Sequence, residues 1–162
     1  MPVIESKIMI NSESFKKNQE DHQKLIDEIR TLEQKIADNS ARSKAKFDKR
    51  GQLLPRERLK RLLDPGRFWL PLSTLAGYKI GDDDGDKNIG WGNSISGIGY
   101  VAGVRCMIGV SDAGIKGGSA SAMGTEKALR GAQIIFENKL PFIQLIESCL
   151  LYTSPSPRDL ST

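Results

Sequence analysis

A glycine-rich stretch, residues 109–124, constrains the fold of this chain more than any other part of its sequence. It carries five glycines in sixteen residues and lies between an apolar run typical of a strand and a helical pattern. Glycine allows positive φ and close approach of the backbone, at a cost in chain entropy. A hydrophobic core does not need so many small residues. The stretch therefore predicts a ligand or tightly packed backbone at this place, and a flexible surface loop is the alternative.

The composition describes one globular region flanked by polar segments. The chain has 162 residues, of which 38% are hydrophobic, and its two ends are the polar parts. The formal net charge is +4, with the basic excess between residues 42 and 67, which suits an anionic partner. Two distant cysteines and one histidine provide neither a zinc ribbon nor a disulfide framework, and we expect no metal site. The acidic loop at 81–86 lacks the glutamate that closes an EF-hand.

The sequence carries no signal for a membrane or for secretion. No apolar run approaches the length of about 18 residues that a membrane span needs, and the N-terminus lacks the apolar region of a signal peptide. We therefore expect a soluble, cytoplasmic protein without a membrane partner.

Hydrophobic periodicity and turn residues predict the order of the elements. Residues 12–46 favour an amphipathic helix, whose apolar stripe would dock on the same or a neighbouring subunit. We then expect a helix over 55–63 with a basic outer face, followed by a hairpin of strands 94–101 and 104–110. A further helix is expected from 125 to about 137, with its apolar stripe at Ala128, Leu129, Ala132 and Ile135. The last expected element is a strand at 140–146 that is buried on both faces. Cys106, inside a strand, is expected to be a buried structural thiol.

Several motifs, taken in order along the chain, resemble those of one enzyme family. They are residues 53–59 (LLPRERL), 62–68 (LLDPGRF), 98–103 (IGYVAG), 111–119 (SDAGIKGGS) and 136–141 (FENKLP). In order and spacing they are similar to the β (carboxyltransferase) subunits of biotin-dependent acyl-CoA carboxylases. The resemblance covers roughly residues 45–148. It does not distinguish propionyl-, methylcrotonoyl-, geranyl- and acetyl-CoA carboxylases.

The resemblance implies an α/β fold of the crotonase-like (ClpP/crotonase) type, a truncated spiral of ββα turns preceded by an N-terminal amphipathic helix. It also implies an acyl-CoA substrate and carboxybiotin carried on a partner subunit or domain, so that this chain binds no biotin covalently. The implied partners are a biotin carboxylase and carrier and further copies of the full-length chain, without nucleic acid. The implied location is the bacterial cytoplasm or, in a eukaryote, the mitochondrial matrix.

Carboxyl transfer needs an enolate of the acyl thioester, which backbone N–H donors stabilise. On the strength of the resemblance we expect the acyl-CoA site to be lined by Lys116, Gly117, Gly118, Ser119 and Ala120. Arg56 and Arg58 are candidate contacts to the CoA phosphates, and solvation with acidic pairing is the other interpretation of their helix face. No catalytic residue is identified, because the glycine-rich oxyanion turn expected directly after Ser148 is absent.

Three segments are expected: a helical extension over 1–47, a partial N-terminal carboxyltransferase domain over 48–148, and a non-native tail over 149–162. The tail resembles the translated read-through of a sequencing adapter. A fragment of this kind is expected to be inactive by itself. Two alternatives stay open: a biotin-dependent decarboxylase or other crotonase-fold acyl-CoA enzyme, and a nucleic-acid-binding module that uses residues 42–67. The basic segment lacks the interleaved aromatic residues that stack on bases.

Overall fold

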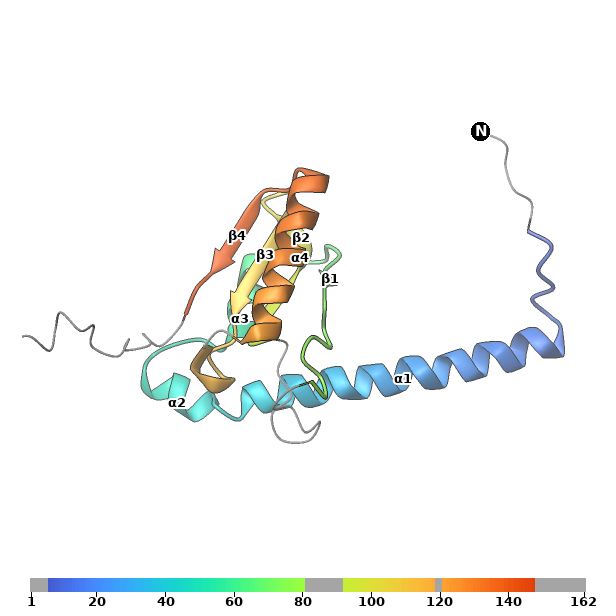
Figure 1. Ribbon diagram of the computed structural model, residues 1–162, viewed down its shortest axis with the longest axis horizontal. Helices are drawn as coiled ribbons and strands as arrows, with labels where there is room; N and C mark the ends of the chain where they lie inside the picture. The colour runs from blue at the N-terminus through green and yellow to red at the C-terminus, as the bar shows by residue number, and fades with distance from the viewer. Residues whose placement is uncertain (1–5, 81–91, 119–120, 148–162) are drawn as a thin grey trace, which may run out of the picture. The chain divides into compact units, whose positions relative to one another are not determined.

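A computed structural model describes residues 6–80, 92–118 and 121–147 of the chain (Figure 1). Several features that the sequence singled out lie outside these ranges: the acidic loop at 81–86, Ser119, Ala120, Ser148 and the tail at 149–162. The elements follow one another as α1 (Glu13–Ala41), α2 (Lys44–Lys49), α3 (Pro55–Leu62), β1 (Leu70–Pro71), β2 (Ser94–Val101), β3 (Val104–Ser111), the 3-10 turn η1 (Lys116–Gly118), α4 (Ala122–Asn138) and β4 (Phe142–Leu145).

The chain forms two compact units, the first ending at Gln34 and the second beginning at Lys35. In the first unit, three apolar residues of α1 are between 43% and 56% exposed, namely Leu25, Ile26 and Ile29. Leu25 and Ile29 belong to the apolar stripe that the sequence predicts for this helix, together with Leu32 and Ile36. The expected boundary between a helical extension and a carboxyltransferase domain, at residues 47 and 48, stays a prediction.

The long N-terminal helix ends earlier than the sequence pattern predicts. Instead of running to residue 46, α1 stops at Ala41 and the separate helix α2 begins at Lys44. The chain turns at Ser43, whose side-chain hydroxyl donates a hydrogen bond of 3.0 Å to the carbonyl of Gly114. The hydrophobic periodicity of the sequence does not report a tertiary contact of this kind. The predicted C-terminal end of the helix is wrong for that reason.

The second unit is built on a four-stranded sheet in the order β1-β2-β3-β4. The predicted hairpin is confirmed, because β2 and β3 pair antiparallel from Ser94 with Ser111 to Val101 with Val104. Its turn at Ala102 and Gly103 has positive φ, and Asp64 accepts both turn N–H groups at 2.8 and 2.7 Å. The hairpin is therefore held by a carboxylate as well as by its ladder.

Helix α4 carries the chain from β3 to β4, which pairs parallel with β3 (Figure 1). It begins at Ala122, three residues before the predicted start, because the Ser121 hydroxyl accepts the Gly124 N–H at 3.0 Å and caps the helix. The predicted apolar stripe is partly confirmed: Ala128, Ala132 and Ile135 border a cavity between α4 and the sheet, whereas Leu129 is 61% exposed. The buried residues of α4, Lys127 and Gly131, are not members of the stripe.

The predicted strand at 140–146 is shorter than expected and is not buried on both faces. Strand β4 covers Phe142–Leu145, with Phe142 50% exposed. It lies at the edge of the sheet over the described residues, where only β3 pairs with it. An apolar run predicts burial, but burial needs covering elements that the described ranges do not supply on that side.

The main core lies between the sheet, α3 and the end of α1. It comprises Ile36, Leu59, Ile95, Cys106, Ile108, Val110 and Ile115. Cys106 is 3% exposed, which confirms the prediction of a buried thiol. Among the helices of the described ranges, none combines the length and the apolar character that crossing a membrane demands.

Candidate functional site

The glycine-rich stretch forms a compact turn directly after β3. The Ile115 N–H donates to the Asp112 carbonyl at 3.0 Å, and the Gly118 N–H donates to the Ile115 carbonyl at 2.9 Å. Gly117 and Gly118 have φ of 65° and 74°, a left-handed conformation that favours glycine. These contacts order residues 112–118 as successive tight turns.

Gly118 lies against the backbone that follows β4. A Cβ atom placed on Gly118 would be 2.8 Å from the carbonyl oxygen of Glu147, which is closer than real Cβ contacts allow. The close backbone approach that the glycine content predicts is therefore present between the turn and the end of β4. Glu147 immediately precedes Ser148, the residue after which the resemblance places the oxyanion turn.

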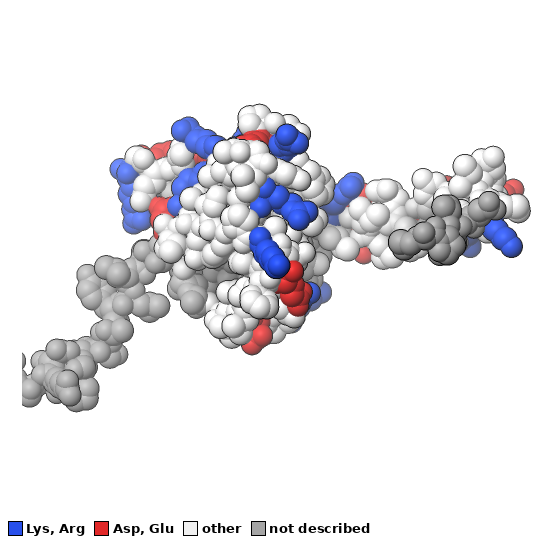
Figure 2. All heavy atoms as spheres, turned by 90° about the horizontal axis from the view of Figure 1, so that it is seen from above, with Lys and Arg blue, Asp and Glu red and all other residues white. Residues whose placement is uncertain are grey.

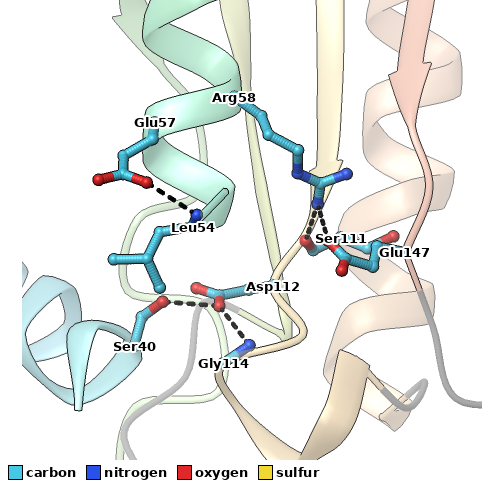
Figure 3. A network of polar contacts seen from close by, with 8 residues as sticks. All are labelled: Ser40, Leu54, Glu57, Arg58, Ser111, Asp112, Gly114 and Glu147. Atoms are coloured by element: carbon cyan, nitrogen blue, oxygen red, sulfur yellow. Dashed lines mark hydrogen bonds and ion pairs between the residues drawn. The ribbon is translucent and has the colours of Figure 1, made fainter. Parts of the chain in front are cut away.

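A buried carboxylate fixes the start of this turn. Asp112 is 0% exposed, and its Oδ1 accepts hydrogen bonds from the Ser40 hydroxyl at 2.7 Å and from the Gly114 N–H at 3.1 Å (Figure 3). Burial raises the pKa of this carboxyl, and the hydrogen bond from Ser40 and the nearby Arg56 charge oppose the rise. The side chain joins the end of α1 to the segment that leaves β3.

Arg58, on α3, reaches the ends of two neighbouring strands. Its Nη2 lies 2.9 Å from Oε2 of Glu147, forming an ion pair in which both side chains are 20% exposed. The same nitrogen donates to the Ser111 carbonyl at 3.3 Å (Figure 3). At the start of α3 the Glu57 carboxylate accepts the Leu54 N–H at 3.0 Å, and Pro55 occupies the first helical position. The local sequence thus fixes the helix that presents Arg58.

Arg56, two residues away, lines a different feature. A surface groove of about 530 Å³ is bordered by apolar and basic side chains, among them Arg56, Leu59, Lys60, Arg67 and Trp69. The charge of Arg56 also acts on buried groups, since it lowers the pKa of both Asp112 and Lys127. Arg56 and Arg58, which we predicted together as phosphate contacts, therefore have different surroundings. Their contact with phosphate stays a prediction.

Lys127 is a feature that the sequence interpretation missed. It is 6% exposed, and its Nζ donates to the Ser94 carbonyl at 2.7 Å. Burial lowers its pKa to about 7, the Arg56 charge adds to this effect and Asp112 opposes it. With Ser96, Gln144 and apolar neighbours, Lys127 borders a cavity of about 320 Å³ between α4 and the sheet. The sequence offers only a weak signal, the four-residue spacing of Lys127 and Gly131 on one helix face.

The described part of the expected acyl-CoA site is small. Lys116 contributes backbone to the turn, and Gly117 and Gly118 complete it. Ser119 and Ala120 lie outside the described residues. Within the described ranges, no three His, Cys, Asp or Glu side chains gather in a way that could hold a metal ion. The arrangement offers a close-packed glycine turn beside a strand end, fixed by the buried Asp112 carboxylate and the partly buried Arg58–Glu147 pair.

Comparison with known proteins adds an independent line of evidence. The family model described as "Carboxyl transferase domain" matches residues 46–149. The β1 subunit of the biotin-dependent 3-methylcrotonyl-coenzyme A carboxylase of Mycobacterium tuberculosis is 39% identical over 130 residues, which cover 80% of this chain and 24% of that protein. The probable mitochondrial methylcrotonoyl-CoA carboxylase β chain of Drosophila melanogaster is 33% identical over 90% of this chain and 25% of its own length.

The solved structures agree with these sequence matches. The β subunit of geranyl-CoA carboxylase from P. aeruginosa superposes with a TM-score of 0.78 at 49% identity, covering 91% of this chain and 27% of that one. The fold is thus that of the crotonase-like carboxyltransferase subunits, here as a truncated sheet with an N-terminal helix. The chain spans about a quarter of the length of the relatives that it matches. From the family match and the fold together, this chain belongs to the carboxyl transferase domain family.

Proposed function

We propose that this chain forms the N-terminal part of a carboxyltransferase subunit that transfers a carboxyl group from carboxybiotin to an acyl-CoA thioester. The observation that carries the proposal is the glycine turn at 116–118, packed against the backbone of Glu147 in a chain of this family. Carboxybiotin is the second substrate and is presented by a biotin carboxylase and carrier partner. The sequence does not identify which acyl chain the acyl-CoA carries.

The chemistry explains why two of the three residues in the turn at 116–118 are glycines. Removal of a proton from an acyl carbon whose negative charge the thioester carbonyl can delocalise produces an enolate, whose oxygen needs N–H donors aimed at it. A backbone segment can approach the thioester most closely where no Cβ lies between them. We propose that Lys116, Gly117, Gly118, Ser119 and Ala120 line the acyl-CoA, with Arg56 and Arg58 toward its phosphates. In the balance of the reaction, the bond between the carboxyl group and the biotin nitrogen breaks, a bond forms between that carboxyl group and the carbon that lost the proton, and biotin is left with the proton.

Replacement of Gly118 by alanine tests this proposal. Both Gly118 and Gly51 have positive φ, but a Cβ at Gly51 meets nothing within 4 Å, so Gly51→Ala is a matched control for backbone strain. In a subunit that continues naturally beyond residue 148, we expect Gly118→Ala to weaken acyl-CoA binding at least about tenfold, an effect of roughly 1.4 kcal/mol. Gly51→Ala should bind like the unaltered subunit. The measurement is isothermal titration calorimetry.

Equal affinity of the folded Gly118→Ala and Gly51→Ala variants would show that the turn is not at the ligand. A biotin-dependent decarboxylase or another crotonase-fold enzyme would also bind acyl-CoA. Biotin-dependent bicarbonate fixation separates these activities, because only the carboxylase depends on both. The assay therefore uses the complete subunit with its biotin carboxylase and carrier partner, ATP and labelled bicarbonate.

The nucleic-acid alternative has less support than the carboxyltransferase. Two basic side chains of residues 42–67 are in ion pairs, Lys44 with Asp48 at 3.0 Å and Arg58 with Glu147 at 2.9 Å. Figure 2 shows Lys and Arg side chains interspersed with acidic and uncharged ones on the face that it draws. Binding to DNA that falls steeply as salt rises would revive this alternative. We further propose that the complete subunit forms a homo-oligomer, in the bacterial cytoplasm or the mitochondrial matrix.

A further inference from the structure

We propose that Arg58 is a positioning residue that acts through Glu147 and sets the spacing between the glycine turn at 116–118 and the end of β4. The proposal deepens the proposed function and rests on it, because it assigns the shape of the acyl-CoA thioester site to an ion pair, a role of Arg58 that is separate from the phosphate contact proposed above. It concerns the placement of two backbone segments, one after β3 and one after β4.

The first argument is where the strand ladder stops. The parallel pairing of β3 with β4 ends at Val110 with Leu145. Ser111 lies one residue beyond this pair and Glu147 two residues beyond its partner. Arg58 Nη2 contacts both, the Ser111 carbonyl at 3.3 Å and the Glu147 carboxylate at 2.9 Å. Arg58 therefore ties the two segments just where the backbone hydrogen bonds between the strands no longer do so.

The second argument is that the turn packs against Glu147, the residue that forms the ion pair with Arg58. Gly118 packs on the Glu147 carbonyl so closely that a Cβ would be 2.8 Å away. A shift of the Glu147 backbone therefore changes the packing of Gly118 and with it the position of the turn. Figure 3 shows the Arg58 side chain extending from α3 to the ends of both strands, beside the Asp112 contact that fixes the start of the turn. Asp112 thus fixes the start of the turn, and Arg58 acts on its other end through Glu147.

The third argument concerns the strength and geometry of the pair. Both side chains are 20% exposed, so water screens them less than it screens the Lys44–Asp48 pair, whose side chains are 55% and 57% exposed. Both contacts are made by the same guanidinium nitrogen, Nη2, which donates a hydrogen bond to the Ser111 carbonyl and forms an ion pair with the Glu147 carboxylate. A lysine at this position keeps the charge but loses the planar geometry of the guanidinium.

The test compares Arg58→Gln, Glu147→Gln and the charge exchange Arg58→Glu with Glu147→Arg in the complete subunit, with Lys44→Gln as the matched ion-pair control. We expect each single variant to raise the KM for acyl-CoA about tenfold or more, with the KM for the biotin substrate unchanged. Arg58→Lys and the charge exchange should recover part of the loss, and Lys44→Gln should behave like the unaltered subunit. Equal KM values for acyl-CoA in Arg58→Gln and the unaltered subunit would overturn the proposal.

A second measurement does not depend on acyl-CoA. In the full chain, hydrogen exchange of the backbone amides at 113–118 should be faster in Arg58→Gln than in Lys44→Gln, while the exchange of the β2–β3 hairpin stays the same. Unchanged exchange at 113–118 contradicts the positioning role. If the exchange changes as expected but the unaltered complete subunit binds no acyl-CoA, the proposed function is wrong and the assignment of Arg58 to an acyl-CoA site falls with it.

Discussion

Lys127 is the residue whose environment departs most from what its chemistry favours. An ammonium group prefers water, yet this side chain is 6% exposed and its Nζ contacts the Ser94 carbonyl at 2.7 Å. Burial lowers its pKa from 10.5 to about 7. Between those two values the unfolded chain keeps a proton on this amine that the folded chain has lost. The folded state therefore gains stability as pH rises through this interval.

This shift gives a prediction for the pH dependence of stability. From pH 7 to about 10, the free energy of unfolding of the unaltered chain should rise relative to that of Lys127→Met, since methionine carries no proton there. The curves should run in parallel below pH 6, where the amine is charged in both states. Urea unfolding at several pH values measures the difference, and Lys139→Met, at an exposed position just after α4, is the control. A constant difference between pH 7 and 10 contradicts the shift.

Helix α4 shows what a capping side chain adds to an element. Ser121 has extended backbone, and its hydroxyl accepts the N–H of Gly124 at 3.0 Å. Such a contact satisfies one of the N–H groups at the start of a helix that have no partner within it. It also lets the helix include Gly124, a residue of low helix propensity. The cap therefore sets both the first residue of α4 and the length of the preceding turn.

Ser121→Ala should lower the free energy of unfolding by about 1 kcal/mol, because alanine has no side-chain acceptor for the Gly124 N–H. Ser121→Asp keeps an oxygen at the same place and adds a negative charge near the helix N-terminus, so it should retain the stability of the unaltered chain. Chemical denaturation followed by far-UV circular dichroism measures both. A loss of the same size in both variants would mean that the hydroxyl does not act as a cap.

The elements that the sequence predicts well are those set by neighbouring residues. The β2–β3 hairpin depends on alternation and on the pair Ala102-Gly103, and helix α3 depends on Pro55 with a leucine face, so both are visible locally. The glycine content likewise predicted a close backbone approach, which Gly118 makes.

The features that the sequence predicts poorly depend on contacts between distant segments. The break after α1 follows from the bond between Ser43 and Gly114, and the buried face of α4 follows from packing of Gly131 near the Met107 side chain. In the site, no sequence motif distinguishes Glu147 from its neighbours. Its pairing with Arg58 cannot be read from spacing, because the two residues meet only when β4 has paired with β3.

At the scale of the whole molecule, the end of α1 belongs to the same compact unit as the sheet, which begins at Lys35. Ile36 is 1% exposed and joins the core, and Ser40 donates to the buried Asp112 carboxylate at 2.7 Å. A polar contact inside the core costs more when one partner is removed than it contributes when both are present, because the remaining group stays buried without its hydrogen bond. The contact should therefore make residues 36–41 unfold together with the sheet.

Ser40→Ala tests this coupling. Loss of the hydroxyl leaves the Asp112 Oδ1 with only the Gly114 N–H among its present hydrogen-bond donors, so the unit from Lys35 onward should lose about 1–3 kcal/mol of stability. The same change removes a hydrogen bond that favours the ionised carboxyl, so the pKa of Asp112 should rise further. A raised pKa in the folded state makes stability fall as pH rises through the acidic range. The stability deficit of Ser40→Ala should therefore be larger at pH 7 than at pH 4.

Ser43→Ala, which removes the partly buried bond to Gly114, should show a smaller loss of stability with no such pH dependence. Urea unfolding at the two pH values, with hydrogen exchange of the amides at 36–41, measures both effects. If the amides at 36–41 exchange as fast in the unaltered chain as those at 20–30, the end of α1 is not part of the cooperative unit.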